Sequence, residues 1–315
     1  MNSRHILPRL TGLASALAVL LTLAACGSTP STSDTAQRSK SSDTPDALLA
    51  DAMRRQNNEI DLVRALPLVK MAYDKAPDRP DIAWLYSQLC ARTANCQPES
   101  SEARLRRLDP DNAAAWLGAL NRAQRNRDIA AENEIIDAMS RSARFDIYWN
   151  PLISQTAVVI GAQTAAQFGP TTPDLVSGSL NDSIGWMSAV ALPAFAPLSD
   201  YCSVERAANP AVAQRCRALA DVLLRGDTYI AEGVGLGIQQ RLAAPGTPQA
   251  AQVSAQIERA RYQRETAGQI IASQADQEKF SRELIKLMAN LRREQDVYLA
   301  VLRWGGKPLE PPPAL

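Results

Sequence analysis

The chain has 315 residues, with 34 lysines and arginines against 33 aspartates and glutamates, and its formal net charge at pH 7 is +1. Such a balanced chain lacks the basic excess that binding to nucleic acid or to a broad anionic surface requires, so we expect no nucleic-acid partner. Histidine occurs once, at His5, close to the N-terminus.

The N-terminal residues have the pattern of a secretory signal peptide. Residues 1–9 contain two arginines and no acid, and residues 10–25 are apolar or small and uncharged. This apolar stretch is too short for a stable transmembrane helix, but it fits the apolar region of a signal peptide. It ends in the run Leu23-Ala24-Ala25-Cys26.

This run resembles the lipobox of bacterial lipoproteins. The resemblance implies cleavage between Ala25 and Cys26, a diacylglycerol on the Cys26 thiol and an acyl chain on its new amino group. Several acyl chains anchor a protein stably, whereas a single chain gives marginal binding. In that family an aspartate after the cysteine implies inner-membrane retention, so Gly27 indicates the outer membrane. The alternatives are an ordinary secretory signal or an uncleaved anchor.

Cleavage before Cys26 would also remove the only histidine. The mature chain would keep 290 residues, with 32 basic (34 minus Arg4 and Arg9) and 33 acidic residues, and a net charge of −1. Without histidine, Ser-His-Asp and Cys-His catalysis and histidine-ligated metals or haem are excluded. We therefore predict a protein that is not an enzyme and has no cofactor, with acidic pairs as the main remaining acid-base groups.

After the cleavage site the sequence predicts a tether and then helices. Residues 26–43 are rich in serine and threonine, which favours a flexible tether. Thr44-Pro45-Asp46 is typical of a helix start, and apolar residues recur at helical spacing over 60–76, with Pro67 as an irregularity. We expect an all-α protein, in which Val158-Val159-Ile160 is the best strand candidate.

Tryptophans recur at Trp84, Trp116 and Trp149, separated by 32 and 33 residues. The first two lie in pairs of predicted helices, over 81–91 and 99–108, and over 112–124 and 128–141. This period and the run LDPDNAAAW resemble tetratricopeptide repeats. The resemblance predicts helical-hairpin repeats over 44–164, with a degenerate first unit over 46–79. The alternative is a generic helical bundle.

The sequence predicts a boundary after the third tryptophan. Residues 165–183 are rich in Gly, Pro, Ser and Thr, so we expect a linker there instead of a clean second helix. Residues 184–304 are predicted to form a helical C-terminal region, with helices over 184–196, 199–208, 211–242 and 249–302, the last as one helix or two. Residues 305–315 end in PPPAL and are expected to form an extended tail.

Four cysteines follow Cys26, namely Cys90, Cys96, Cys202 and Cys216. An even number in an exported chain predicts two disulfides, with three possible connectivities. Pairing of neighbours is the simplest, because each neighbouring pair spans one short predicted turn. A metal held by four thiolates is the alternative, although the close spacing typical of such sites is missing.

Three short motifs have a chemical and a structural interpretation. Glu99-Ser100 resembles the Glu-Ser of lytic transglycosylases, but the downstream signature of that family is absent. Gly233-x-Gly235-x-Gly237 lacks the strand of a dinucleotide fingerprint and predicts close helix packing. Gly305-Gly306-Lys307 follows a predicted helix and indicates a helix end, not a phosphate loop.

The predicted function is a lipid-anchored, non-enzymatic scaffold or binding module at the periplasmic face of the outer membrane, for an envelope protein or peptide. Gln88, Asn121 and Gln124 would face the concave side of the repeats, although a solvated helix face is the simpler interpretation. The alternatives are a structural lipoprotein without a dedicated ligand and a carboxylate-dependent enzyme acting on glycan. Two carboxylates about 5–10 Å apart in a deep pocket would favour that enzyme.

Overall fold

The computed structural model describes residues 43–54, 61–172, 174–274 and 277–312. The predicted signal peptide, the predicted lipidation site Cys26 and the predicted tether up to residue 42 lie outside the described residues. Lys40–Leu315 form one compact unit of the chain. Among the described residues, no helix combines the length and the apolar character needed to span a membrane.

The predicted all-α fold is confirmed, because the described residues form fifteen α-helices and no strand beyond an isolated β-bridge between Asn112 and Arg144. The strand candidate Val158-Val159-Ile160 lies inside a helix. In chain order the elements are α2 (Pro45–Met53), α3 (Leu62–Lys75), α4 (Pro80–Ala91), α5 (Glu99–Leu108), the 3-10 helix η1 (Ala113–Trp116), α6 (Leu117–Arg125), α7 (Ile129–Ser140), α8 (Trp149–Phe168), α9 (Leu175–Trp186), the π-helical turn η2 (Met187–Ala191), α10 (Ala196–Tyr201), α11 (Val204–Ala207), α12 (Pro210–Leu223), α13 (Tyr229–Leu242), α14 (Pro248–Gln274), α15 (Glu278–Asn290) and α16 (Glu294–Trp304).

The first helices begin as their sequence predicts. The Thr44 side chain accepts a hydrogen bond from the Ala47 amide at 3.2 Å, and Pro45 occupies the first position of α2. Thr44 therefore pairs one of the amides that a helix start leaves without an intrahelical acceptor. Pro67 is accommodated inside α3, so the irregularity does not end that helix.

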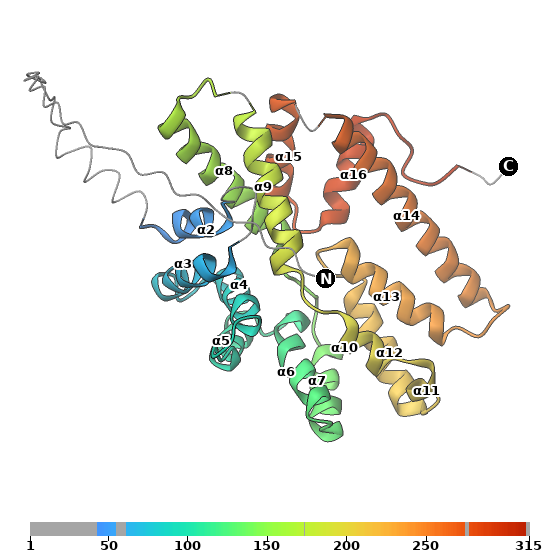
Figure 1. The fold of residues 1–315 in the computed structure, drawn as a ribbon. Coiled ribbons are helices and arrows are strands. Elements are labelled where there is room, and N and C mark those ends of the chain that lie inside the picture. The colour runs from blue at the N-terminus through green and yellow to red at the C-terminus, as the bar shows by residue number, and fades with distance from the viewer. Residues whose placement is uncertain (1–42, 55–60, 173, 275–276, 313–315) are drawn as a thin grey trace, which may run out of the picture. The chain divides into compact units, whose positions relative to one another are not determined.

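Helical hairpins repeat along the N-terminal half (Figure 1). The helix pairs α2–α3, α4–α5, α6–α7 and α8–α9 each pack together. With η1 counted as the start of the third hairpin, the hairpins begin at residues 45, 80, 113 and 149, which are 35, 33 and 36 residues apart. Their tryptophans occupy different positions, however: Trp84 lies within α4, Trp116 ends η1 and Trp149 begins α8. The hairpin period is therefore present, and its assignment to the tetratricopeptide type stays a prediction.

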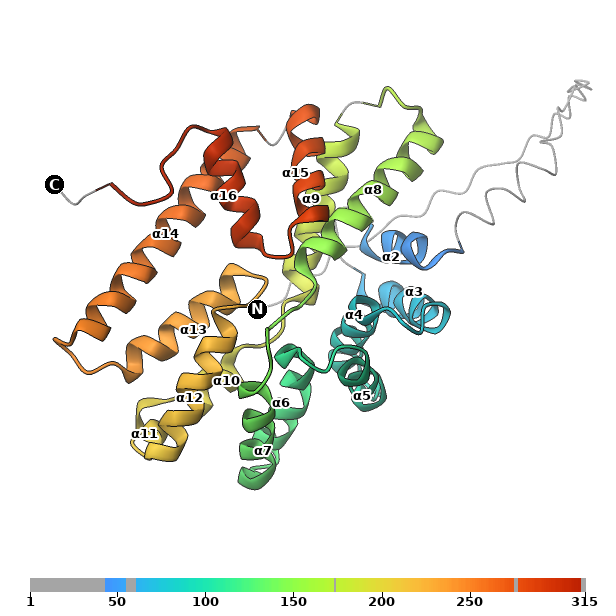
Figure 2. The ribbon, with the colours of Figure 1, turned by 180° about the vertical axis from the view of Figure 1, so that it is seen from behind.

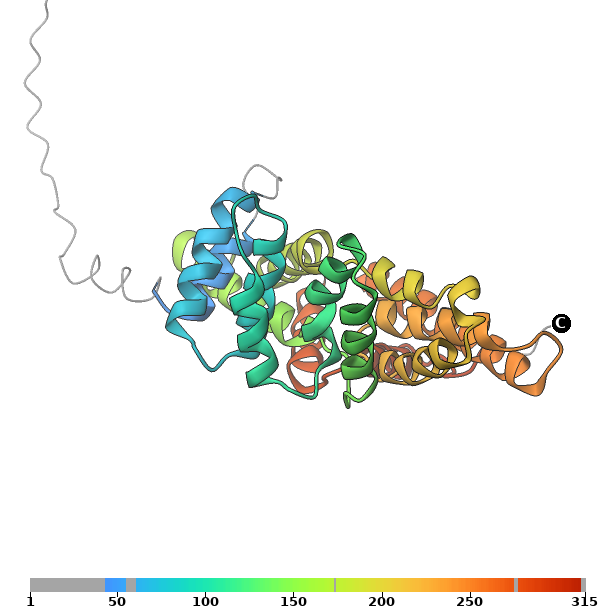
Figure 3. The same ribbon diagram turned by 90° about the horizontal axis from the view of Figure 1, so that it is seen from below.

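The C-terminal helices pack against the N-terminal hairpins. After the hairpins, α7 packs on α12, α13 on α14 and α14 on α16, while α15 packs on α8, and α8 on α2 (Figures 2 and 3). In an open solenoid each repeat contacts only its neighbours along the chain. Here the C-terminal helices also contact the N-terminal half, so the two predicted halves share one core.

The predicted linker over 165–183 is mostly helical. Helix α8 continues to Phe168 and ends at Gly169, whose φ is +100°, and α9 begins at Leu175. The side chains of Val176 and Leu180 are buried where α9 packs on α8. Glycine and serine do not prevent helix formation here because this apolar face is covered, so the third tryptophan unit does have a second helix.

The predicted helix over 211–242 is also interrupted, between α12 and α13. A Cβ at Gly226 would lie 2.6 Å from the Ala231 Cβ and 2.8 Å from the Leu223 carbonyl oxygen, so the chain turns there through a space that only glycine fits. Thr228 then caps α13 by accepting a hydrogen bond from the Ala231 amide. Further on, the segment 249–302 forms three helices, α14, α15 and α16, instead of one or two.

The C-terminal residues leave α16 as predicted. Gly305 follows the last residue of the helix and Gly306 has a φ of +63°, a conformation that favours glycine. The non-helical segment then runs along α14, where the Tyr262 hydroxyl donates to the Pro308 carbonyl at 3.2 Å and Gln263 Nε2 donates to the Leu309 carbonyl at 2.9 Å. Residues 313–315 of the predicted tail lie outside the described part of the chain.

Both disulfides are present with the local pairing. Cys90 is bonded to Cys96 and Cys202 to Cys216, with Cα–Cα distances of 5.1 and 5.7 Å. We expect a thiol-reactive probe to leave all four cysteines unlabelled in the denatured, oxidised protein and to label them after reduction. Labelling of any of the four before reduction would contradict the pairing.

The glycines of α13 make a matched test of helix packing. A Cβ at Gly235 would lie 3.0 Å from the Ala220 carbonyl oxygen and 3.1 Å from the Leu223 Cβ of α12, whereas a Cβ at Gly233 would have no neighbour within 4 Å. Gly235→Ala is therefore expected to lower the free energy of unfolding by about 1 kcal/mol, because it overpacks this contact. Gly233→Ala should raise it by about 0.5–1 kcal/mol, because alanine favours the helix. Urea unfolding of the two variants measures this, and shifts of the same sign would contradict it.

Candidate functional site

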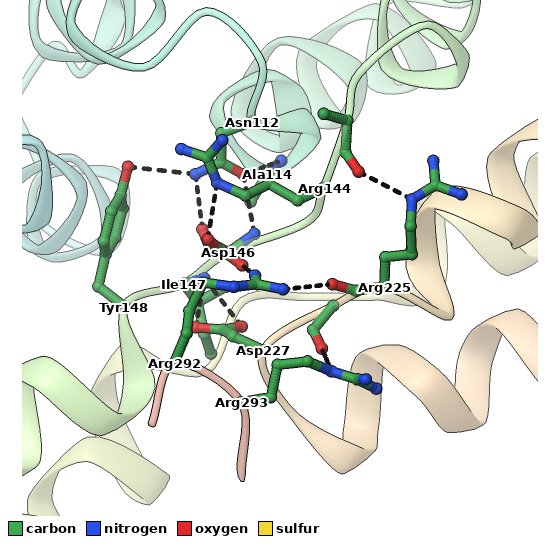
Figure 4. Close-up of polar contacts among 12 residues, drawn as sticks. Asn112, Ala114, Arg144, Asp146, Ile147, Tyr148, Arg225, Asp227, Arg292 and Arg293 are labelled. Carbon is green, nitrogen blue, oxygen red and sulfur yellow. Dashed lines mark hydrogen bonds and ion pairs between the residues drawn. The ribbon is translucent and has the colours of Figure 1, made fainter. Parts of the chain in front are cut away.

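Three connecting segments meet at a cluster of polar side chains (Figure 4). They are the segment between α7 and α8, the segment between α12 and α13, and the segment between α15 and α16. Together with the region after α5 they contribute the residues that we call the polar junction, namely Asp109, Asn112, Arg144, Asp146, Tyr148, Asp227 and Arg292.

Asp146 lies at the middle of the polar junction. Its carboxylate accepts a hydrogen bond from Arg144 Nε at 2.8 Å and pairs with the guanidinium of Arg292. Asn112 binds its backbone, because Asn112 Oδ1 accepts from the Asp146 amide at 2.8 Å and Asn112 Nδ2 donates to the Asp146 carbonyl at 2.9 Å. Burial raises the pKa of the Asp146 carboxyl, and the two arginines oppose this shift.

Asp109 joins the end of α5 to the start of α8. Its carboxylate accepts a hydrogen bond from the Tyr148 hydroxyl at 2.6 Å and pairs with Arg144. Tyr148 directly precedes α8 and has a φ of +58°, which is uncommon for a residue with a large side chain. Burial raises the pKa of the Tyr148 hydroxyl, and the neighbouring Asp109 raises it further.

Asp227 is the most deeply buried acid of the polar junction. Its carboxylate accepts hydrogen bonds from the backbone amides of Ile147 and Trp149, each at 3.0 Å. Burial raises the pKa of the Asp227 carboxyl to about 8; the neighbouring Asp146 adds to the shift, and the two amides oppose it. Asp227 thus pairs two amides at the start of α8 with a carboxyl group that desolvation drives toward its protonated form.

The same residue also positions the first residue of α16. The Asp227 carbonyl accepts a hydrogen bond from the Glu294 amide at 2.8 Å. The Glu294 carboxylate in turn accepts from the Tyr229 amide at the start of α13, also at 2.8 Å. Asp227 therefore holds Trp149 on one side and Glu294 on the other, and both residues line a cavity beside the polar junction.

This junction cavity has a volume of about 330 Å³ and lies between α8, α9, α14, α15 and α16. Its walls are mainly apolar, and its polar lining side chains are Asn181, Glu294 and Tyr298. Burial raises the pKa of Glu294, opposed by hydrogen bonds from the Tyr229 amide and the Tyr298 side chain. Mainly apolar walls with a few converging polar groups are typical of a binding pocket of this size.

The residues that the sequence suggested for binding or catalysis do not line the junction cavity. Gln124 Nε2 donates to Glu132 Oε1 and to the Pro197 carbonyl, both at 2.8 Å, so this side chain links helices within the fold. Glu99 begins α5, with its carboxylate 3.4 Å from Arg122 Nε. Gln88 and Asn121 are half-buried on α4 and α6. The structure does not bring these four residues together into one site.

The junction cavity was missed by sequence reasoning, although one signal was present. The sequence contains two similar runs, Asp81-Ile82-Ala83-Trp84 and Asp146-Ile147-Tyr148-Trp149. In each, an arginine lies two positions before the aspartate: Arg79 before Asp81 and Arg144 before Asp146. Both arginines use Nε to bind that aspartate at 2.8 Å. The recurrence of this partly buried ion pair marks Asp146 as structurally important, but it gives no information on Asp227 or Glu294.

Comparisons with known proteins identify no relative. No protein-family model, curated protein or solved structure is significantly similar to this chain.

Proposed function

We propose that this chain is a lipid-anchored protein of the bacterial cell envelope that binds an envelope partner without catalysing a reaction. The run Leu23-Ala24-Ala25-Cys26 supports the anchor, since it resembles a lipobox and follows an uncharged apolar stretch. Gly27 favours the periplasmic face of the outer membrane. The junction cavity is the observation that supports binding, because it presents an apolar pocket on a scaffold stabilised by buried hydrogen bonds.

Binding is favoured over glycan hydrolysis because of the way the buried acids are used. Glycosidases place two carboxyl groups about 5–10 Å apart on either side of the sugar bond. The junction cavity is lined by one carboxylate, that of Glu294. Other buried acids pair with arginines: Glu102 with Arg122 and Glu132 with Arg206. These pairs connect helices, which is a structural use of charge.

The lipid anchor is tested by mass spectrometry of the protein extracted from membranes. We expect the mature chain to begin at Cys26 and to carry the mass of a diacylglycerol and an acyl chain. The Cys26→Ala variant should no longer fractionate with membranes. An unmodified Cys26, or a mature chain that begins elsewhere, would contradict the proposal.

The partner is tested by crosslinking in intact cells. A photoreactive amino acid at Asn181, an exposed residue that lines the junction cavity, should form a discrete crosslinked species with one envelope protein. The matched control is the same amino acid at Ser188, which is also exposed and does not line that cavity. Equal crosslinking from both positions would contradict a binding role for the cavity. Release of soluble fragments from envelope glycan by the purified protein, and its loss in Glu294→Gln, would favour the enzyme instead.

A further inference from the structure

A second cavity, of about 380 Å³, lies between α8, α9 and α15. We call it the α8–α15 cavity. Its floor includes small residues of α8 that recur one helical turn apart, at Ala157, Gly161 and Ala165. Because residues four apart share one face of a helix, these small residues form one side of the cavity along α8, which we call the α8 trough. Val158 borders the trough and is 57% exposed, so an apolar surface reaches the solvent.

The wall formed by α9 is also suited to an apolar ligand. Leu175 and Val176 contribute aliphatic side chains. The polar residue of this wall is Ser179, whose hydroxyl donates to the Val176 carbonyl at 2.9 Å within the helix. Since this hydroxyl already has an acceptor, covering the wall with hydrocarbon leaves no donor of Ser179 unpaired.

The charged residues that line this cavity are both basic. Arg282 and Lys286 lie one turn apart on α15, with side chains that are 59% and 67% exposed. Each pairs with an acid of its own helix, Arg282 with Glu278 at 3.5 Å and Lys286 with Glu283 at 2.8 Å. Exposed pairs of this kind add little stability, so both cations remain available to an anion at the cavity mouth. The Glu278 carboxylate is itself held by the Val176 and Ser177 amides.

The described chain begins beside the same helix. Helix α2 packs on α8, where Arg54 Nη2 donates to Gln163 Oε1 and Gln163 Nε2 donates to Asp51. Asp43, the first described residue, is 17 residues after Cys26. If Cys26 carries the lipid, a chain of this length spans at most about 60 Å even when fully extended. The compact unit that contains the α8–α15 cavity would then stay tethered to a source of acyl chains.

We propose that the α8–α15 cavity binds a long-chain fatty acid, with its acyl chain in the α8 trough and its carboxylate between Arg282 and Lys286. The apolar floor selects hydrocarbon, and the two cations select an anionic head over a neutral or cationic one. The volume lies within the range of small-ligand pockets, about 300–1,000 Å³. A membrane as the source of this ligand rests on the proposed lipid anchor, whereas the binding itself does not.

The test uses the mature chain with Cys26→Ala, which lacks the lipid and keeps every other residue. The probe is a dansyl-labelled undecanoic acid, whose fluorescence rises in an apolar site, displaced by palmitate below its micelle concentration. We expect saturable binding that the double variant Arg282→Gln, Lys286→Gln weakens at least tenfold. The control Lys279→Gln removes one positive charge from an exposed position of α15 that does not line this cavity, and it should leave the affinity unchanged, whereas each of the single variants Arg282→Gln and Lys286→Gln should weaken binding.

A second variant tests the trough independently of charge. Ala165→Trp should fill the floor and abolish probe binding while both cations remain. Displacement by hexadecanol or hexadecylamine as effective as that by palmitate would overturn the proposal, as would unchanged affinity in the double variant. Binding to anionic vesicles without binding of monomeric fatty acid would also overturn it. Because the displacement assay with monomeric fatty acid contains neither a membrane nor a protein partner, its result is independent of the crosslinking at Asn181 and of the proposed lipid on Cys26.

Discussion

Asp227→Ala is expected to lower the free energy of unfolding by about 2–6 kcal/mol. The variant leaves the amides of Ile147 and Trp149 buried without an acceptor, and each unpaired group costs about 1–3 kcal/mol. Because Asp227 is fully buried where three connecting segments meet, water has little access to replace the lost carboxylate. Urea unfolding followed by far-ultraviolet circular dichroism measures the change.

Asp221→Ala is the matched control. Asp221 is an exposed residue of α12 that accepts a hydrogen bond from Gln239 Nε2 at 3.1 Å, so its loss should change the stability by no more than about 0.5 kcal/mol. Asp227→Ala should also weaken crosslinking from Asn181, because the lost carboxylate holds the amide of Trp149, a residue in the wall of the junction cavity. Equal urea midpoints for the two variants would show that the carboxylate of Asp227 does not stabilise the start of α8.

Helices whose signals are local could be predicted from the sequence. The helix expected over 99–108 matches α5, and Thr44-Pro45-Asp46 begins α2 as its capping pattern requires. The neighbouring disulfides belong to the same class, since each closes a short loop. Where the prediction was wrong, as at the linker over 165–183, composition suggested a loop but burial of α9 against α8 stabilises a helix.

The polar junction could not be predicted, because its partners are far apart in the chain. Arg292 binds Asp146 across 146 residues, and the Trp149 amide binds Asp227 across 78. Helical periodicity reports which face of a helix is buried, but it does not report which loop an unpaired aspartate will meet. The break at Gly226-Asp227-Thr228 did have a local signal, a glycine followed by a capping threonine. We expected one helix over 211–242 because the apolar residues on both sides share its period.

The pH dependence of stability is the second large effect expected from Asp227. Its pKa rises from about 3.8 in the unfolded chain to about 8 in the folded protein, so between these values the folded state holds the extra proton. This stabilisation is complete below the unfolded pKa and is lost as the pH rises through 8. The free energy of unfolding should therefore increase by about 1.4 kcal/mol for each pH unit on acidification from pH 8 toward pH 6. Urea midpoints at about pH 6, 7 and 8.5 measure this slope.

Asp227→Asn is the control, because asparagine keeps the shape of the side chain and does not titrate. The groups that face Asp227 include Asp146, whose pKa burial also raises, and Arg292, whose guanidinium opposes the rise in the pKa of Asp227. Burial tends to raise the pKa of Glu132, but hydrogen bonds from Arg206 and Gln124 outweigh this and lower it. The stability that the protein gains from Glu132 is therefore lost only at more acidic pH. If cleavage before Cys26 removes His5, no histidine titrates between pH 6 and 8.5 and the slope belongs to the buried acids. Equal slopes of the free energy of unfolding against pH for the wild-type protein and Asp227→Asn would contradict a proton held at Asp227. A slope found only in the wild-type protein would place that proton at Asp227, where α8, α13 and α16 begin.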